Sequence, residues 1–208
     1  MSITYPLSMP ATPGFRNFIL GENNIVSIAV SPFTGSTQVQ QWPGEWWEAD
    51  CALPPLPQST VEPWKVFLTS LRGQVGSFLL GDVLNTRPAG VATGTPVVNG
   101  AQVGGSNTLA TRGWTHNVTG ILQAGDYIQI GTGLKQRLYK ILTTQNSDSS
   151  GDATFDIFPA IRPEGVTDGQ SIVTVSPQGV FRLSGNYRSW SSDVTRLTVI
   201  SFKCVEAL

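Results

Sequence analysis

The chain has 208 residues, and only 13% of them are charged, against roughly 25% in a typical soluble domain. Its formal net charge of −1 gives no overall electrostatic attraction to nucleic acid or to an anionic membrane. The 22 glycines and 14 prolines favour a β-rich fold with many turns. A surface with so few charges also suits a protein that is packed against neighbours.

The two cysteines, Cys51 and Cys204, are too few and too far apart for a disulfide framework or a zinc site. We expect both thiols to be reduced and buried. The first ten residues lack the basic and apolar regions of a signal peptide, and no apolar run has the length of a membrane span. These features predict a protein that is made in a cytoplasm and does not insert into a membrane.

The N-terminal part predicts a proline-rich, irregular arm over residues 1–17, followed by short strands. Turn-forming residues at Gly21–Asn24, at Ser31–Gly35 and at Pro43-Gly44 are expected to connect these strands. The expected strands are Phe18–Leu20, Ile25–Val30, Thr37–Trp42 and Trp46–Ala52.

Three of the six tryptophans, Trp42, Trp46 and Trp47, lie close together in this part of the chain. We favour the interpretation that their side chains line the core of a β-sandwich. The alternative is a stacking platform that binds sugars or bases. Glu45 and Glu48 lie beside them, as a glycosidase pair would, although a solvated strand face also explains these carboxylates.

The sequence predicts one helix, over residues 61–72. Apolar residues at i, i+3, i+4 and i+7 form a single stripe, namely Trp64, Phe67, Leu68 and Leu71. Ser59 or Thr60 is expected to cap its start, and Gly73 to end it. A buried strand, Gly76–Leu80, follows. An amphipathic helix of this length needs a sheet to pack against.

After Leu80 a second set of strands is expected, and five short strands in under a hundred residues suggest a small closed barrel of the OB type. These strands are Ala101–Thr111, Tyr127–Ile130, Leu138–Thr143, Ala153–Phe158 and Ser171–Val175.

From Pro177 onward the sequence pattern again resembles that of the N-terminal part. The strands expected here are Gly179–Leu183, Ser189–Asp193 and Thr195–Phe202. We therefore predict a β-sandwich domain formed by residues 1–85 and 177–208. Residues 86–176 are predicted to form an OB-fold-like barrel inserted into one of its loops.

We found no arrangement of residues that predicts catalysis, and we expect no catalytic residue, no bound metal and no cofactor. The one histidine, His116, has no partner for a triad or a metal site nearby. Gly131-Thr132-Gly133 begins like a dinucleotide loop but lacks the third glycine. Asn146–Gly151 resembles the start of a calcium loop, yet Ile157 stands where the bidentate glutamate is required. A hairpin turn explains it better.

The predicted barrel does not have the charge of a nucleic-acid-binding module. Six basic residues balance six acidic ones between Arg87 and Ser176. A groove that tracks a nucleic-acid strand needs a basic surplus. Only Lys135, Arg137 and Lys140 form a small basic spot, so we expect no nucleic-acid partner.

Several short motifs, in their order and spacing, resemble the distal tail (Dit-type) proteins of long-tailed bacteriophages, in particular the short kind with an inserted OB-fold domain. The resemblance covers nearly the whole chain. The motifs are Trp64–Leu71 followed by Gly73 and Gly81-Asp82, then Ala124–Tyr127, Arg137–Ile141, Val180–Leu183 and Ile200–Leu208.

This resemblance implies a structural protein of the virion tail tip that is not an enzyme. Six copies of the β-sandwich domain would form a ring that joins the tail tube to the tail tip or baseplate hub. The OB-fold insert would project outward, and in the family it is sometimes proposed to contact host-surface polysaccharide. The family has no catalytic residues to transfer to this chain.

Two further functions stay open at this point. The chain could be a carbohydrate-binding module for host adhesion, with Trp42, Trp46 and Trp47 as the sugar platform. A glycoside hydrolase would need two carboxylates at catalytic separation in one cleft.

The ring that the resemblance implies is physically plausible, because a closed assembly buries strand edges that would otherwise pair at random.

Overall fold

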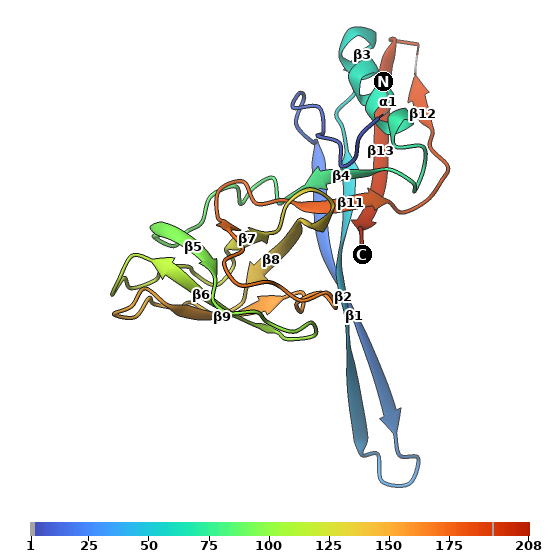
Figure 1. The fold of residues 1–208 in the computed structure, drawn as a ribbon. Helices are drawn as coiled ribbons and strands as arrows, with labels where there is room; N and C mark the ends of the chain where they lie inside the picture. The colour runs from blue at the N-terminus through green and yellow to red at the C-terminus, as the bar shows by residue number, and fades with distance from the viewer. Residues whose placement is uncertain (1–2, 193) are drawn as a thin grey trace.

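The structure is a computed structural model that describes residues 3–192 and 194–208. It is a mainly β chain with one α-helix among the described residues and with two sheets, one of which is barrel-like (Figure 1). The predicted fold class is confirmed. Residues 1 and 2 of the predicted arm and Asp193 of a predicted strand lie outside the described residues.

The first sheet takes its strands from both ends of the chain. Its order is β1-β2-β13-β11-β4, and the short strands β3 and β12 pair with β13. Its strands are β1 (Asn17–Val30), β2 (Thr37–Ala52), β3 (Leu56–Pro57), β4 (Ser77–Leu80), β11 (Gly179–Leu183), β12 (Trp190–Ser192) and β13 (Leu197–Glu206).

The second sheet takes all its strands from the middle of the chain, in the order β10-β7-β8-β9-β6-β5. A bridge between Val97 and Ser171 brings its two end strands together, so the sheet is nearly closed. It has six strands rather than the predicted five, because the sequence analysis missed β5. Its strands are β5 (Gly94–Val98), β6 (Thr108–Trp114), β7 (Tyr127–Ile130), β8 (Arg137–Ile141), β9 (Ala153–Phe158) and β10 (Ile172–Val173), and a 3₁₀ turn, η1 (Gly133–Lys135), precedes β8.

β1 and β2 form one long hairpin, whose base belongs to the first sheet and whose outer part projects beyond both sheets (Figure 1). The predicted turns at Gly21–Asn24 and Pro43-Gly44 are wrong, because both stretches lie inside continuous strands. Gly21, Glu22 and Asn23 pair with Glu48, Trp47 and Trp46, and the register then shifts so that Ile25 pairs with Trp42. Asn24 and residues 43–45 therefore lie at a bulge in the ladder. The predicted turn at Ser31–Gly35 is confirmed: it connects β1 to β2, and the Ser31 amide donates to the Ser36 carbonyl at 2.9 Å.

The helix α1 (Gln58–Ser70) begins three residues before the predicted start and ends two residues before the predicted end. The predicted apolar stripe is confirmed, since Trp64, Phe67, Leu68 and Leu71 are all buried. The predicted side-chain cap is wrong: the N-cap is Pro57, and Ser59 and Thr60 lie within the helix. The chain leaves the helix through Arg72 and Gly73, whose φ angles are 49° and 69°.

The N-terminal arm packs on the helix and extends the first sheet. Leu7 forms a parallel bridge with the free edge of β4: its amide donates to the Ser77 carbonyl and its carbonyl accepts from the Leu79 amide, at 2.9 Å each. The Tyr5 hydroxyl donates to the Ser70 carbonyl at 2.7 Å. The arm therefore covers the β4 edge of the first sheet and leaves β1 as the free edge.

The two sheets share part of one core. The core of the first sheet includes Tyr127, Leu138 and Phe158 from the barrel, whereas a second cluster fills the barrel itself. The chain leaves the first sheet at Gly81 and returns to it at Pro177, and a Cβ atom added to Gly81 would lie 2.1 Å from the Pro177 carbonyl oxygen. The two crossings between the sheets are thus in direct contact.

Candidate functional site

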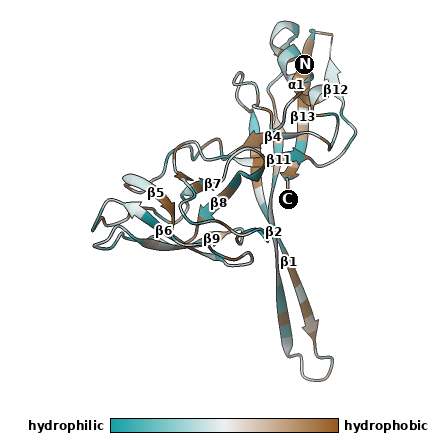
Figure 2. Cartoon of the chain, viewed as in Figure 1, coloured by the Kyte–Doolittle hydropathy of each residue, from teal (hydrophilic) through white to brown (hydrophobic). Residues whose placement is uncertain are grey.

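The most unusual surface of the molecule is the outer part of the hairpin, residues 23–44, which we call the distal ribbon. It contains no charged residue and no histidine. Its large apolar side chains are exposed, including Ile28 (63%), Val39 (60%) and Phe33 at the tip (94%). Figure 2 shows hydrophobic segments mainly along β1, whereas the outer part of β2 is mostly hydrophilic on this scale. An exposed ribbon of this composition is unusual for a chain that stays alone in water.

Both edges of the distal ribbon are free among the described residues. β2 pairs with β13 only from Ala52 to Glu48, and beyond that point its outer edge has no strand beside it. The outer edge of β1 has no pairing strand along its whole length. The hydrogen bonds of the distal ribbon are all made within the hairpin.

The three candidate sugar-platform tryptophans lie in different environments. Trp42 is 55% exposed on the distal ribbon. Trp46 is half-buried, and its indole nitrogen donates to Glu48 Oε1 at 3.0 Å. Trp47 is 3% exposed and donates to the Leu138 carbonyl at 3.0 Å, with its ring edge-to-face against Phe158. The structure does not bring the three rings together on one open face.

A buried charge cluster holds the base of the hairpin against the barrel. The carboxylate of Glu45 accepts from the Ala160 amide at 2.8 Å. Arg162 donates through one terminal nitrogen to the Glu45 carbonyl and through the other to Glu206. Glu206 also accepts from the Trp47 amide at 3.2 Å. Burial raises the pKa of Glu206, and the neighbouring Arg162 opposes this effect only in part.

Other buried titratable groups are also held in structural contacts. Burial raises the pKa of Tyr127 to about 12, and the nearby Asp82 adds to this effect. Burial also raises the pKa of Tyr139 to about 12. Both cysteines are free and buried, as predicted. The pKa of Cys204 is raised because its thiol hydrogen-bonds with Cys51 and is buried.

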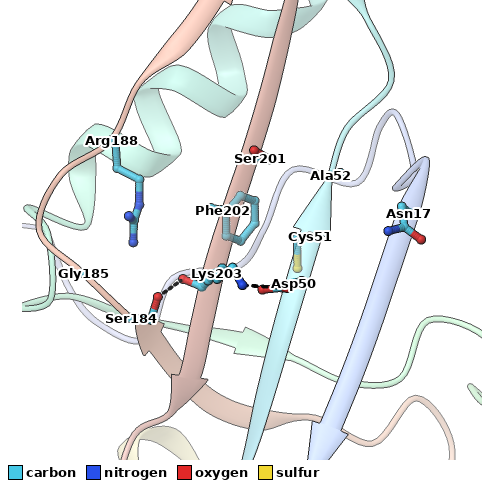
Figure 3. A pocket seen from close by; sticks show the side chains of 10 residues that line it. All are labelled: Asn17, Asp50, Cys51, Ala52, Ser184, Gly185, Arg188, Ser201, Phe202 and Lys203. Atoms are coloured by element: carbon cyan, nitrogen blue, oxygen red, sulfur yellow. Dashed lines mark hydrogen bonds and ion pairs between the residues drawn. The ribbon is translucent and has the colours of Figure 1, made fainter.

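A cavity of about 420 Å³ lies across β2 and β13 of the first sheet (Figure 3). Asp50 and Lys203 form an ion pair of 3.1 Å there, and the Ser184 hydroxyl donates to the Lys203 carbonyl at 3.2 Å. The lining holds no histidine, and its one carboxylate is already paired. It therefore places no free base beside a nucleophile.

The loop that resembles a calcium site is a hairpin turn. Asp148 Oδ1 accepts from the amides of Ser150 and Asp152 at 2.7 and 2.9 Å. These N–H groups lower the pKa of Asp148, and the N–H group of Asp152 has the largest effect. Within residues 3–192 and 194–208, no group of three or more His, Cys, Asp or Glu residues is arranged to hold a metal ion.

No protein-family model matches the chain, and no curated protein matches it significantly. Among the described residues, no helix has the length and apolar character needed to cross a membrane. The resemblance to distal tail proteins therefore stays a prediction, and the functional argument rests on the surfaces described above.

Proposed function

We propose that this chain is a structural subunit of a bacteriophage tail, which assembles with copies of itself into a closed ring between the tail tube and the tail tip or hub. The observation that carries this proposal is the distal ribbon. The phage context, the six copies, the tube and hub partners and the virion location come from the sequence resemblance alone.

A distal ribbon of this kind needs a partner for physical reasons. An isolated two-stranded ribbon is marginally stable in water. Its free edges offer unpaired N–H and C=O groups to any other strand, and charges that would block such pairing are absent from residues 23–44. Exposed apolar residues on a charge-free surface favour burial against another protein.

A ring of copies satisfies both edges at once. The β1 edge of one copy would pair with the β2 edge of the next, and the pairing would be antiparallel because β1 and β2 run in opposite directions. This contact joins two different surfaces head to tail, which generates a closed ring when the rotation permits. Closure then leaves no free edge on the ribbons.

The test is a pair of charge insertions on the distal ribbon. Ile28 and Val39 lie directly opposite each other, so Ile28→Lys with Val39→Lys places two like charges on one cross-strand pair. We expect the wild type to form rings in light scattering and negative stain, and the double variant to remain monomeric. Val66→Lys is the control, because Val66 is equally exposed (62%) but lies on the helix.

Two results would count against the proposal. Rings of unchanged stability in the double variant would remove the distal ribbon from the assembly. If antibody against the chain labels no part of a phage tail, the tail assignment fails. Sugar binding would then become the leading function, with Trp42 as the exposed ring available for stacking.

A further inference from the structure

The distal ribbon leaves the body at a point where the strand ladder is irregular. β2 pairs with β13 only from Ala52 to Glu48, so beyond Glu48 the hairpin consists of two strands. The register of the hairpin then shifts between Asn23 and Ile25, and residues 43–45 lie at the resulting bulge. A bulge bends its strand and increases the local twist. The direction of the distal ribbon relative to the body therefore depends on what holds the chain at this bulge.

Glu45, the first residue of β2 after the distal ribbon, connects the bulge to the barrel. Its side chain is buried, and the residue is 2% exposed. The Oε2 atom accepts from the Ala160 amide at 2.8 Å, and the backbone carbonyl accepts from Arg162. Both partners belong to the loop that follows β9, and this loop reaches the base of the hairpin (Figure 1). The barrel thus contacts both the side chain and the backbone of one residue at the bulge.

The same carboxylate also binds the distal ribbon. The side-chain nitrogen of Gln41 donates to Oε1 of Glu45 at 2.8 Å. Gln41 is exposed and lies in the regular part of the ribbon ladder, opposite Val26. One oxygen of Glu45 therefore takes a donor from the ribbon, and the other oxygen takes a donor from the barrel.

The chemistry of these contacts requires a carboxylate. Both side-chain partners of Glu45 are N–H donors, and each binds a different oxygen. Glutamine would offer one acceptor and one donor, so its NH₂ group would face one of these N–H groups. A movement that separates Glu45 from Ala160 would leave a buried amide without an acceptor, which is unfavourable.

Trp47 also attaches β2 to the barrel, but at a place further from the distal ribbon. Its indole nitrogen donates to the Leu138 carbonyl, and its ring packs against Phe158. Trp47 pairs in register with Glu22, on the body side of the bulge. Among the described hydrogen bonds between β2 and the barrel, those of Glu45 lie nearest to the ribbon.

From these contacts we propose that Glu45 is a positioning residue that fixes the direction of the distal ribbon relative to the barrel, so that the two parts move as one body. The inference concerns the isolated chain. Its consequence for assembly rests on the proposed function, since strand edges that already point in one direction lose less conformational freedom when copies join.

The experiment measures the distance between the ribbon and the barrel by double electron–electron resonance. Nitroxide labels are attached to the chain with Phe33→Cys and Ser149→Cys, two exposed positions, whereas the native cysteines are buried. An excess of unlabelled chain restricts the signal to distances within one chain. We expect a single narrow distribution for the otherwise unchanged chain. Glu45→Gln should raise the population of other distances roughly fivefold, the factor that the loss of one hydrogen bond gives.

Gln41→Ala is a second variant, in case Glu45→Gln does not fold. It removes only the bond from the ribbon to Glu45, at an exposed residue, and should broaden the distribution in the same direction. Glu48→Gln is the matched control, because it makes the same change on the same strand. Asn23 and Trp46 both donate to one oxygen of Glu48, and glutamine retains such an acceptor. The control should therefore leave the distribution narrow.

Three results would overturn this inference: a broad distribution without any change at Glu45, no broadening in either Glu45→Gln or Gln41→Ala, or equal broadening in Glu48→Gln. If Glu45 positions the ribbon, Glu45→Gln should also form fewer closed rings in negative stain than the wild type. A wild type that forms no rings would contradict the proposed function, whereas the distances within the isolated chain would still decide the role of Glu45.

Discussion

At the scale of single residues, the junction between the sheets depends on charges that the chain buries at some cost. Arg162 bridges Glu206 on β13 and the Glu45 carbonyl on β2. Glu206 Oε1 has no donor among the described residues. Removing one member of a buried charge pair is usually far more damaging than the pair itself is stabilising. The junction is therefore held in place more by the cost of breaking these contacts than by their net attraction.

Glu206 should make the stability of the chain depend on pH. Its native pKa lies above the ordinary value of 4.5, so the folded chain holds this proton more tightly than the unfolded chain. Its contribution is present in full below about pH 4.5 and is lost as pH rises through the native pKa. The stability of Glu206→Gln relative to the wild type should thus increase from pH 4.5 to 7.

The size of this increase is about 1.4 kcal/mol for each pH unit by which the pKa is raised. Denaturant unfolding at several pH values measures it. Glu164→Gln is the matched control, because it makes the same change at a half-exposed carboxylate outside this buried cluster. A relative stability that falls with pH would mean that Arg162 outweighs burial and lowers the pKa of Glu206.

At the scale of elements, the sequence predicted what local spacing determines. The bounds of three strands were predicted as observed, namely Tyr127–Ile130, Ala153–Phe158 and Gly179–Leu183. The buried stripe of the helix was also predicted. The hairpin was predicted only in part: its turn at Ser31–Gly35 was expected, but Gly21–Asn24 and Pro43-Gly44, which are each typical of turns, lie inside its strands. Only the pairing across the ladder shows that Asn24 and residues 43–45 form a bulge. The absence of charge over residues 23–44 was a visible signal for the distal ribbon that the sequence analysis did not use.

Gly81 tests how tightly the two crossings between the sheets pack. A Cβ atom at Gly81 would lie 2.1 Å from the backbone oxygen of Pro177, so Gly81→Ala must displace one crossing. We expect a loss of about 1–3 kcal/mol in the free energy of unfolding. At Gly185 a Cβ atom would meet nothing within 4 Å, so Gly185→Ala should change stability by less than about 0.5 kcal/mol. If both substitutions change the free energy of denaturant unfolding equally, the chain connections at Gly81 and Pro177 can move apart without loss of stability.

At the scale of the whole molecule, the shared core joins segments that are distant in sequence. Trp47 donates to the Leu138 carbonyl, 91 residues away, and Arg162 contacts the Glu45 carbonyl, 117 residues away. Single-sequence patterns report neighbours at spacings of two to four residues and carry no information on such contacts. For this reason the mainly β fold was predictable from the sequence, whereas the buried position of Trp47 and the buried charge cluster around Arg162 were not.

The body and the distal ribbon should differ in stability within one chain. β13 has strands on both sides, so its amides should open only with the larger part of the first sheet. The distal ribbon has a two-stranded ladder with exposed apolar faces, and its amides should exchange at the fast end of the range in the isolated monomer. Assembly into a ring should then slow exchange in residues 23–44 much more than in β13. Hydrogen exchange followed by mass spectrometry, before and after assembly, measures this difference. Strong protection of the distal ribbon in a verified monomer would mean that the hairpin is stable without neighbours, and the physical argument for a ring would lose its basis.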